Sequence, residues 1–530
     1  MKHRTHYILI TCLLLVLPFA ACNKFGNMNT NPVQSVQMDP AIQLSFVQLQ
    51  YSGNLETNER LGAMLTMPMV QHIGGAWSNQ YGGMYAKQME YMSILWQSNY
   101  ISEIRNIVDA VKRSTGDPKR INLNAICRIM KVFIFSRITD LYGDIPYTEA
   151  AAAYTDNTIK PKYDRQEDIY NDFFKELTEA VAQLDPQKET NPQDLFFKGN
   201  VTQWKRFGNS LHLRLAMRLI KVNPDKAKAE VKKAFDGGLM ASNEDICLLR
   251  HENIQATYSD VRGNGLSAAL NQGDLISYRI SNTFINSLKN TNDPRLEHFV
   301  RYYWDNPYKP FERVDITAEV KAQVGYVGVS NGLFIWDEWK EPLTIQSPVL
   351  GEQKVLNNLQ KAQLANFLIT NNAPYMHLTY AEVELLLAEA CFRWNLNLGG
   401  NHTVHYNNGM KAACQQLALF PGGPVITDQQ ITKFQADNVL APGKELSQIN
   451  TQLWTALLLN GPEAYANWRR TGFPKLEPGY NPTYSAIKTI PRRFEYPLTE
   501  KEQNSVNYNE ALKSMGGKDD WTNRVWWDKQ

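Results

Sequence analysis

The chain has 530 residues, of which 43% are hydrophobic and 20% are charged, a composition typical of a globular protein. Its 55 Lys and Arg residues almost balance its 53 Asp and Glu residues, for a formal net charge of +2. This balance argues against a nucleic-acid partner, because proteins that bind phosphate backbones usually carry a basic excess.

The N-terminus has the pattern of an exported protein. Residues 1–7 are basic, and residues 8–21 form an almost wholly apolar run that is shorter than the roughly 20 residues of a membrane-spanning helix. A basic head followed by a short apolar stretch is typical of a secretory signal. No later run reaches 18 consecutive apolar residues, so the rest of the chain is expected to be soluble.

The end of this apolar run contains a cysteine in a distinctive setting. Ala20-Ala21-Cys22 is similar to the lipobox of bacterial lipoproteins, with Phe19 where Leu is usual. We therefore expect a signal peptide over residues 1–21, a lipid attached to Cys22, and a polar tether over residues 22–40. The alternative is a plain signal peptide with an incidental cysteine.

Helical periodicity dominates the first part of the chain. Apolar residues recur at steps of three and four in residues 122–142, 168–184, 201–222 and 225–235, and Gly or Pro follows most of these runs. Their arrangement in pairs at irregular spacing is similar to degenerate tetratricopeptide hairpins.

The middle of the chain differs from both ends. Residues 240–375 are rich in Gly, Asn, Pro and aromatics, which predicts loops and short strands with one short helix near residues 281–289. Helices return at Thr379, which forms a capping-box pattern with Glu382, and continue at residues 408–419 and 446–459.

The fold class that follows is mainly α, with a tetratricopeptide-like hairpin scaffold and an irregular, minor-β portion that holds the ligand site. We expect one domain over residues 41–530. Within it, the scaffold would occupy about 41–240 and 376–470, the loop-rich insert 241–375, and a C-terminal segment 471–530.

Sequence patterns for catalysis, cofactors and metals are absent. The chain has no phosphate-binding glycine loop, no H-E-x-x-H and no G-x-S-x-G. His402 and His405 are expected in a solvated loop, and the four cysteines after Cys22 are too far apart for a zinc pattern. We expect no catalytic residue, no metal and no cofactor.

We interpret the charged residues of several segments as structural rather than catalytic. Glu382, Glu384 and Glu389 are interpreted as capping and surface charges rather than as a glycosidase acid pair. The clusters Arg469-Arg470 and Arg492-Arg493 are interpreted as structural pairing partners.

Aromatic density in loop-like sequence is the main indication of a ligand site. Rings offer flat apolar platforms, and neighbouring amides and acids can bond hydroxyl groups, a combination that suits sugars. The alternative for each ring is the hydrophobic core. The residues predicted to contact a ligand are Trp77, Tyr81, Tyr85, Trp96, Tyr302, Trp304, Trp336 and Trp339.

Several segments together resemble one family. In chain order they are ITDLYGDIPYTEA (138–150), WKRFGNSLHLRLAMR (204–218), NDPRL (292–296), LTYAEVELLLAEA (378–390), YANWRRTGFP (465–474), RRFEYP (492–497) and the ending WWD (526–528). These segments resemble the SusD/RagB family of nutrient-binding outer-membrane lipoproteins, especially its SusD-like branch.

The resemblance implies an α-rich, non-catalytic protein that is lipid-anchored at the outer membrane and exposed at the cell surface. It implies a SusC-like TonB-dependent transporter as partner, and capture of oligosaccharides for delivery to that transporter. Peptide ligands in the same role are the second hypothesis, and a surface glycoside hydrolase is the third. The residues Asn23-Lys24-Phe25 lack the acidic run often associated with surface export.

Overall fold

The computed structural model describes residues 38–76, 79–153, 157–271, 278–305, 313–338 and 340–530. The predicted signal peptide, Cys22 and most of the tether lie outside these residues. Among the described helices, none combines the length and apolar character needed to cross a bilayer.

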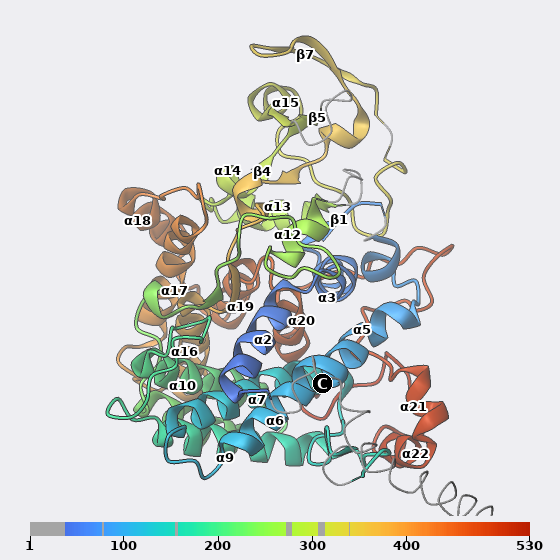
Figure 1. The fold of residues 1–530 in the computed structure, drawn as a ribbon. Coiled ribbons are helices and arrows are strands. Elements are labelled where there is room, and N and C mark those ends of the chain that lie inside the picture. Colours follow the sequence, from blue (N-terminus) through green and yellow to red (C-terminus); the bar gives the residue numbers. More distant parts are fainter. Residues whose placement is uncertain (1–37, 77–78, 154–156, 272–277, 306–312, 339) are drawn as a thin grey trace, which may run out of the picture.

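The described part of the chain is mainly helical (Figure 1). The α-helices are α2 (Pro40–Gly53), α3 (Leu55–Thr57), α4 (Met67–Met69), α5 (Met89–Asn99), α6 (Arg105–Ser114), α7 (Ile121–Tyr142), α9 (Gln166–Gln183), α10 (Val201–Arg218), α11 (Pro224–Asp236), α12 (Gly265–Leu270), α13 (Asn282–Asn290), α14 (Leu296–Phe299), α15 (Thr317–Val324), α16 (Tyr380–Trp394), α17 (His402–Gln415), α18 (Asp428–Asp437), α19 (Glu445–Ala456), α20 (Gly461–Thr471), α21 (Leu498–Gln503) and α22 (Ser505–Lys513). Wider π-helical turns span Asn58–Thr66, Asn79–Gly83 and Tyr100–Ile104, and tighter 3₁₀ turns span Asn243–Asp245, Asn357–Gln360, Asn366–Ile369 and Gln416–Leu419.

Strands are short and pair two by two, always antiparallel. They are β1 (Ile73–Gly74) with β3 (Arg279–Ile280), β2 (Cys247–Leu249) with β10 (Tyr375–Leu378), β4 (Val300–Arg301) with β9 (Gln363–Leu364), β5 (Tyr303–Asp305) with β6 (Arg313–Asp315), and β7 (Leu343–Ser347) with β8 (Gly351–Val355).

Antiparallel helix pairs build the scaffold. α2 packs on α6, α7 on α9, α10 on α11 and α16 on α17, and neighbouring pairs contact one another through α6 with α7, α9 with α10, and α10 with α16. The prediction of a mainly α, tetratricopeptide-like fold is confirmed. Several predicted helices have nearly the observed bounds, because long amphipathic runs followed by Gly or Pro leave little freedom in where a helix ends. The helix predicted at 408–419 is an exception, since it is observed at His402–Gln415.

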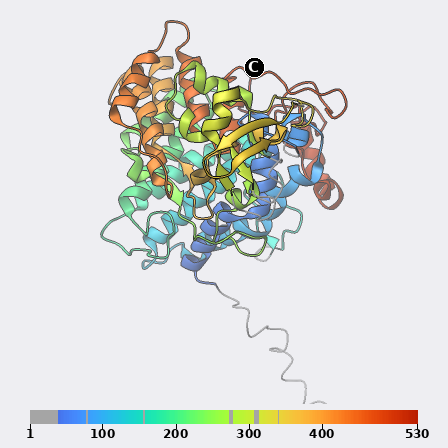
Figure 2. The same ribbon diagram turned by 90° about the horizontal axis from the view of Figure 1, so that it is seen from above.

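A smaller lobe projects from the scaffold. It comprises β4 to β9, residues 300–364, with α15 between its strands, and it lies at the top of Figure 1. In the view from above in Figure 2, the yellow strands of the lobe are drawn in front of the scaffold helices. The prediction of loops, short strands and a helix near 281–289 in residues 240–375 is confirmed, but α12, α14 and α15 were not predicted.

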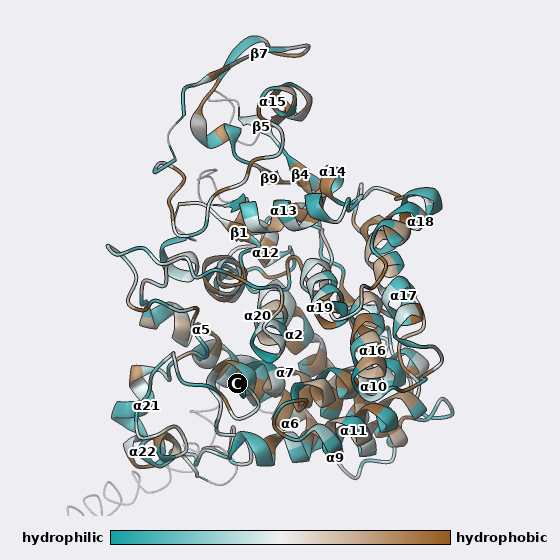
Figure 3. Ribbon diagram, turned by 180° about the vertical axis from the view of Figure 1, so that it is seen from behind, coloured by the Kyte–Doolittle hydropathy of each residue, from teal (hydrophilic) through white to brown (hydrophobic). Residues whose placement is uncertain are grey.

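Hydrophobic side chains fill the centre of the scaffold. Figure 3 shows brown hydrophobic residues on central helices such as α16, and more hydrophilic residues on α21 at the edge. Trp204, Trp454 and Trp527 are among the largest fully buried side chains. Burial of such rings stabilises the fold by about 1.5–3 kcal/mol each. Cys127, Cys247, Cys391 and Cys414 are buried free thiols, and for Cys127 and Cys391 the helical pattern around them predicts this burial.

The acidic residues of α16 are not surface charges. Glu382 accepts hydrogen bonds from Arg214 at 2.6 and 2.7 Å, and Glu389 binds Arg470 at 2.7 and 2.9 Å. The surface interpretation was wrong because these partners lie far away in sequence. The capping box is only half formed: Thr379 accepts from the Glu382 backbone at 3.2 Å, but the Glu382 carboxylate binds Arg214 instead of returning the bond.

His405 lies in helix α17, not in a solvated loop. Its side chain is buried, and Nδ1 lies 2.8 Å from a Glu384 carboxylate oxygen. Burial alone would lower the pKa of His405, but hydrogen bonds to Cys391 and Glu384 outweigh it and raise the pKa to about 9. The expectation for His405 was therefore wrong, since the ion pair with Glu384 allows the ring to be buried.

The C-terminal segment is held by the two arginine clusters. Arg492 binds Asp528 at 2.5 and 2.8 Å, and Arg493 binds Asp519 at 2.6 Å. Arg469 donates to the backbone carbonyls of Asp140 and Arg492. These contacts confirm structural pairing, and they attach the end of the chain to α7 and α20.

Candidate functional site

Three segments that are distant in sequence meet at the base of the lobe. They are the turn at residues 79–85, the loop at residues 329–338, and the loop at residues 477–486. Asn79 Nδ2 donates to the Leu333 carbonyl at 2.5 Å, and Asn331 Nδ2 donates to the Glu477 carbonyl at 2.7 Å. The Ala486 amide donates to the Tyr85 carbonyl at 3.1 Å. Together these bonds fix the three loops to one another.

Two glycines make this close approach possible. Gly332 has φ of +76°, and a Cβ there would lie 3.0 Å from the backbone of Gly479. A Cβ on Gly479 would lie 2.0 Å from the Gly83 carbonyl oxygen. Any larger residue at either position would push the loops apart.

An aromatic cluster lies where these loops meet, and we call Phe334, Trp336 and Tyr484 the aromatic platform. Phe334 and Trp336 are stacked with ring centroids 4.7 Å apart, and Tyr484 meets Phe334 edge-on at 5.1 Å. Phe334 is buried, whereas Trp336 is 50% exposed and Tyr484 is 42% exposed. The buried ring thus supports two rings that face solvent, and pairing of this kind restricts their motion.

A second small core lies under the loop at residues 329–338. Ala76, Val329 and Ile335 form a buried hydrophobic cluster separate from the main core. Ile335 lies between Phe334 and Trp336 in sequence, so burial of its side chain in this cluster anchors the loop that carries both rings.

Polar groups surround the platform. Asp337 accepts a hydrogen bond from the Phe334 amide at 2.9 Å, and Glu338 accepts from Lys361 Nζ at 2.6 Å and from Ser330. Burial acts to raise the pKa of Glu338, but the hydrogen bonds from Lys361 and Ser330 outweigh it and lower the pKa. Glu338 therefore stays ionised and serves as a hydrogen-bond acceptor rather than a proton donor.

Among the predicted ligand residues that the structure describes, Trp336 lies on the platform and the others lie elsewhere. Tyr81 is half-buried and meets Tyr91 edge-on at 4.9 Å, and Trp304 is half-buried in β5 opposite Val314. Trp77 and Trp339 lie outside the described residues.

Ligand contact does not fit three of the predicted residues, because their side chains are buried. Tyr85 is 1% exposed and its hydroxyl accepts from the Gly479 amide at 2.9 Å. Trp96 is packed among four tyrosines, and the Tyr302 hydroxyl accepts from the Val327 amide at 2.7 Å. These aromatics stabilise the loops and the core, which was the alternative for each ring in the sequence.

Tyr484 and its exposed neighbour Tyr480 were not predicted. Both are 42% exposed, and they lie in the stretch PGYNPTYSA. The signal available in the sequence was the same as for Trp77: tyrosines between Gly, Pro and Asn, outside any helical period. Only the fold brings this stretch next to Trp336.

Candidate metal sites are lacking in the parts of the chain that the structure describes, since no group of three or more His, Cys, Asp or Glu side chains is placed to hold an ion there.

A sequence model of the SusD-like family, described as starch-binding and associating with the outer membrane, matches residues 32–497. The chain belongs to the SusD-like family. A search of curated proteins finds no significant match.

Solved structures agree with this membership. A chitin-binding protein is 36% identical, with a TM-score of 0.80, over 93% of this chain and 100% of that chain. A SusD-like protein described as Bacteroidetes AC2a is 31% identical, with a TM-score of 0.84, over the same shares of the two chains. A chitin-binding SusD homologue from Flavobacterium johnsoniae is 24% identical, with a TM-score of 0.71 over 92% of this chain and 98% of that chain, and shares the fold.

Proposed function

We propose that this SusD-like protein is a non-catalytic carbohydrate-binding protein that captures oligosaccharides on the aromatic platform. The observation that carries the proposal is the exposed face of Trp336, stacked on buried Phe334 beside Tyr484. A flat apolar face suits the C–H side of a sugar ring, and the surrounding amides and carboxylates suit its hydroxyl groups.

Chitin fragments are the first ligands to test. A relative that is 36% identical over almost the whole chain is described as chitin-binding, and the family as a whole is described as starch-binding. Both descriptions concern chains of sugar rings, which an aromatic platform can bind through stacking.

Delivery to a SusC-like TonB-dependent transporter, with an outer-membrane lipid anchor at Cys22, completes the proposed role. It is supported by the family membership and by the lipobox-like Ala20-Ala21-Cys22. A Cys22→Ala variant is expected to leave the membrane fraction while it still binds sugar. A variant that stays acylated would contradict the anchor.

Calorimetry on the chain from residue 23 onward tests the binding role. Chitin oligosaccharides, maltooligosaccharides and unrelated peptides are titrated separately, and the sugars are checked for hydrolysis products. We expect heat from at least one sugar series and no product. Binding of peptides alone would contradict the sugar proposal in favour of peptide capture, and turnover would contradict the non-catalytic role.

A further inference from the structure

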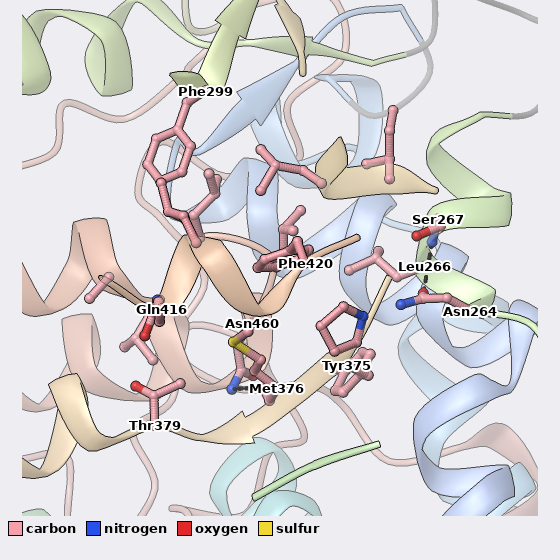
Figure 4. Close-up of a pocket in the computed structure, with 18 of the residues that line it drawn as sticks. Asn264, Leu266, Ser267, Phe299, Tyr375, Met376, Thr379, Gln416, Phe420 and Asn460 are labelled. Carbon is pink, nitrogen blue, oxygen red and sulfur yellow. Dashed lines mark hydrogen bonds between the residues drawn. The ribbon is translucent and has the colours of Figure 1, made fainter. Parts of the chain in front are cut away.

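A second site lies inside the molecule, in a cavity of about 50 Å³ whose lining residues all lie outside the lobe (Figure 4). Helix α12, strand β10, the 3₁₀ turn Gln416–Leu419 and the turn between α19 and α20 contribute to its walls. Its lining shares no residue with the aromatic platform. The volume is several times the roughly 10–15 Å³ that one water molecule needs.

The walls are mostly apolar. Leu266, Phe299, Tyr375 and Phe420 are among the lining side chains, and all four are buried. Half-buried Met376, Leu458 and Leu459 also line the cavity, and their partial exposure marks the side on which it comes nearest to solvent.

Three polar atoms on these lining residues have no hydrogen-bond partner within the described parts of the chain. They are Arg295 Nη1, Gln416 Oε1 and Asn460 Oδ1, and each residue is less than 9% exposed. A buried polar atom without a partner is costly, so such atoms usually bind water or a ligand.

Hydrogen bonds made by the same side chains show that one of these atoms is a free acceptor and another is a free donor. Asn460 Nδ2 donates to the His377 carbonyl at 3.2 Å, which identifies Oδ1 as the free acceptor. Arg295 donates to both Asp293 oxygens and to Gln452, which leaves Nη1 as the free donor.

The charge of Arg295 is balanced inside the protein. Its Nη2 lies 2.6 Å from Asp293, and both side chains are almost completely buried. An anion would gain little from a neutralised guanidinium and would meet two amide oxygens. The cavity is therefore matched to a neutral molecule.

We infer that this cavity is a binding site for a small neutral molecule that carries both a hydrogen-bond acceptor and a donor on an apolar body, such as a primary amide or an alcohol. The acceptor would bind Arg295 Nη1 and the donor would bind Gln416 Oε1, while the second N–H of a primary amide would bind Asn460 Oδ1. The apolar body would lie against the leucine and phenylalanine walls.

Three probes of nearly the same shape separate the contributions of the hydrogen-bond donor and of charge to binding. Propionamide has the donor, butanone has a methyl group in place of the amide nitrogen, and propionate is an anion. Binding to the chain from residue 23 onward is followed by NMR titration, and the occupied site is identified by crystallography. We expect propionamide to bind in the cavity, butanone to bind about tenfold more weakly because an acceptor stays unpaired, and propionate more weakly still.

Gln416→Leu and Gln415→Leu provide a matched pair of variants. Gln416 is buried in the cavity wall, whereas its neighbour Gln415 is exposed. Gln416→Leu should weaken propionamide binding about tenfold and leave the melting temperature unchanged or higher, since it removes an unpaired buried acceptor. Gln415→Leu should change neither.

Three results would overturn the inference. They are a cavity that holds only water at saturating propionamide, equal binding of all three probes, or equal propionamide affinity in the two variants. Sugar binding at the platform is measured alongside, and its presence or absence does not bear on the cavity.

Discussion

The scaffold and the lobe use the same residue types in opposite ways. In the scaffold, Trp204, Trp454 and Trp527 are completely buried. In the lobe, Trp336 is half-exposed on top of a buried phenylalanine. Aromatic content therefore does not separate core from binding surface. The difference between core and binding surface comes from the backbone. Glycines that let the loops approach closely, and hydrogen bonds between the loops, hold an exposed ring in place where no helix packs over it.

Ion pairs in the scaffold and near the platform also differ in how deeply they are buried. Arg470 and Glu389 are both completely buried, whereas the Lys361–Glu338 pair beside the platform has a carboxylate that is 18% exposed. A buried pair stabilises only as long as both partners are present, while a pair at the surface contributes little. The first two predictions test the scaffold, and the last two test the platform.

The largest effect is expected from Glu389→Gln. This change leaves Arg470 and Arg393 without their shared carboxylate, and loss of one partner of a buried pair costs about 3–5 kcal/mol. Urea denaturation measures the free energy of unfolding. The control is Glu510→Gln, whose partner Lys513 is also exposed, with an expected loss below about 1 kcal/mol. Equal losses would contradict the contrast between buried and exposed pairs.

Acid should destabilise the protein through the same carboxylate. Burial acts to raise the pKa of Glu389, but Arg470 and Arg393 outweigh it and lower the pKa from 4.5 to about 2. Because the folded pKa lies below the unfolded value, this contribution is complete above pH 4.5 and is lost as the pH falls towards 2. The shift corresponds to up to about 3 kcal/mol.

The measurement is the free energy of unfolding of wild type and Glu389→Gln across that pH range. The variant should lose less stability on acidification than wild type does. Parallel curves would show that other carboxylates account for the acid sensitivity.

On the platform, Trp336→Ala should weaken binding of the preferred oligosaccharide about tenfold, because the main exposed stacking face is lost. The melting temperature should change little, since the ring is 50% exposed. Calorimetry gives the affinity, and Tyr258→Ala removes a comparably exposed aromatic outside the platform as a control. Unchanged affinity in Trp336→Ala would remove the platform from the site.

The smallest effect is expected from Tyr484→Phe, which keeps the ring against Phe334 and removes only the hydroxyl. One lost neutral hydrogen bond to a sugar weakens binding about threefold. Comparison with Tyr484→Ala in the same titration separates the hydroxyl from the ring. If the two variants behave alike, the hydroxyl rather than the ring makes the contact.

Much of the scaffold was predictable, because the bounds of a helix depend on residues within and next to that helix. The helix expected at residues 122–142 is observed at Ile121–Tyr142, and the one expected at 225–235 is observed at Pro224–Asp236. Apolar spacing gives the helix, and a following Gly or Pro gives its end. Helix α2 (Pro40–Gly53) was not predicted individually, although the helical scaffold was expected to begin at residue 41.

The candidate site was only partly predictable, because it depends on contacts between distant segments. Trp336 was identified from its sequence neighbourhood, yet the ring that it stacks on, Phe334, also packs against Tyr484, almost 150 positions later. Tyr85 and Tyr302 have similar neighbourhoods and are buried. No local pattern distinguishes a ring that another loop covers from one that it leaves open.

The sequence by itself determined the helical scaffold, the loop-rich lobe and the family, since each depends on periodicity, turn residues or short motifs within one segment. The tertiary structure alone decided which aromatics face solvent, which glutamates are buried against arginines, and where an internal cavity remains. The physical reason is that burial is a property of the whole chain. A side chain is exposed or covered, and a charge is paired or free, only once segments far apart in sequence have packed together.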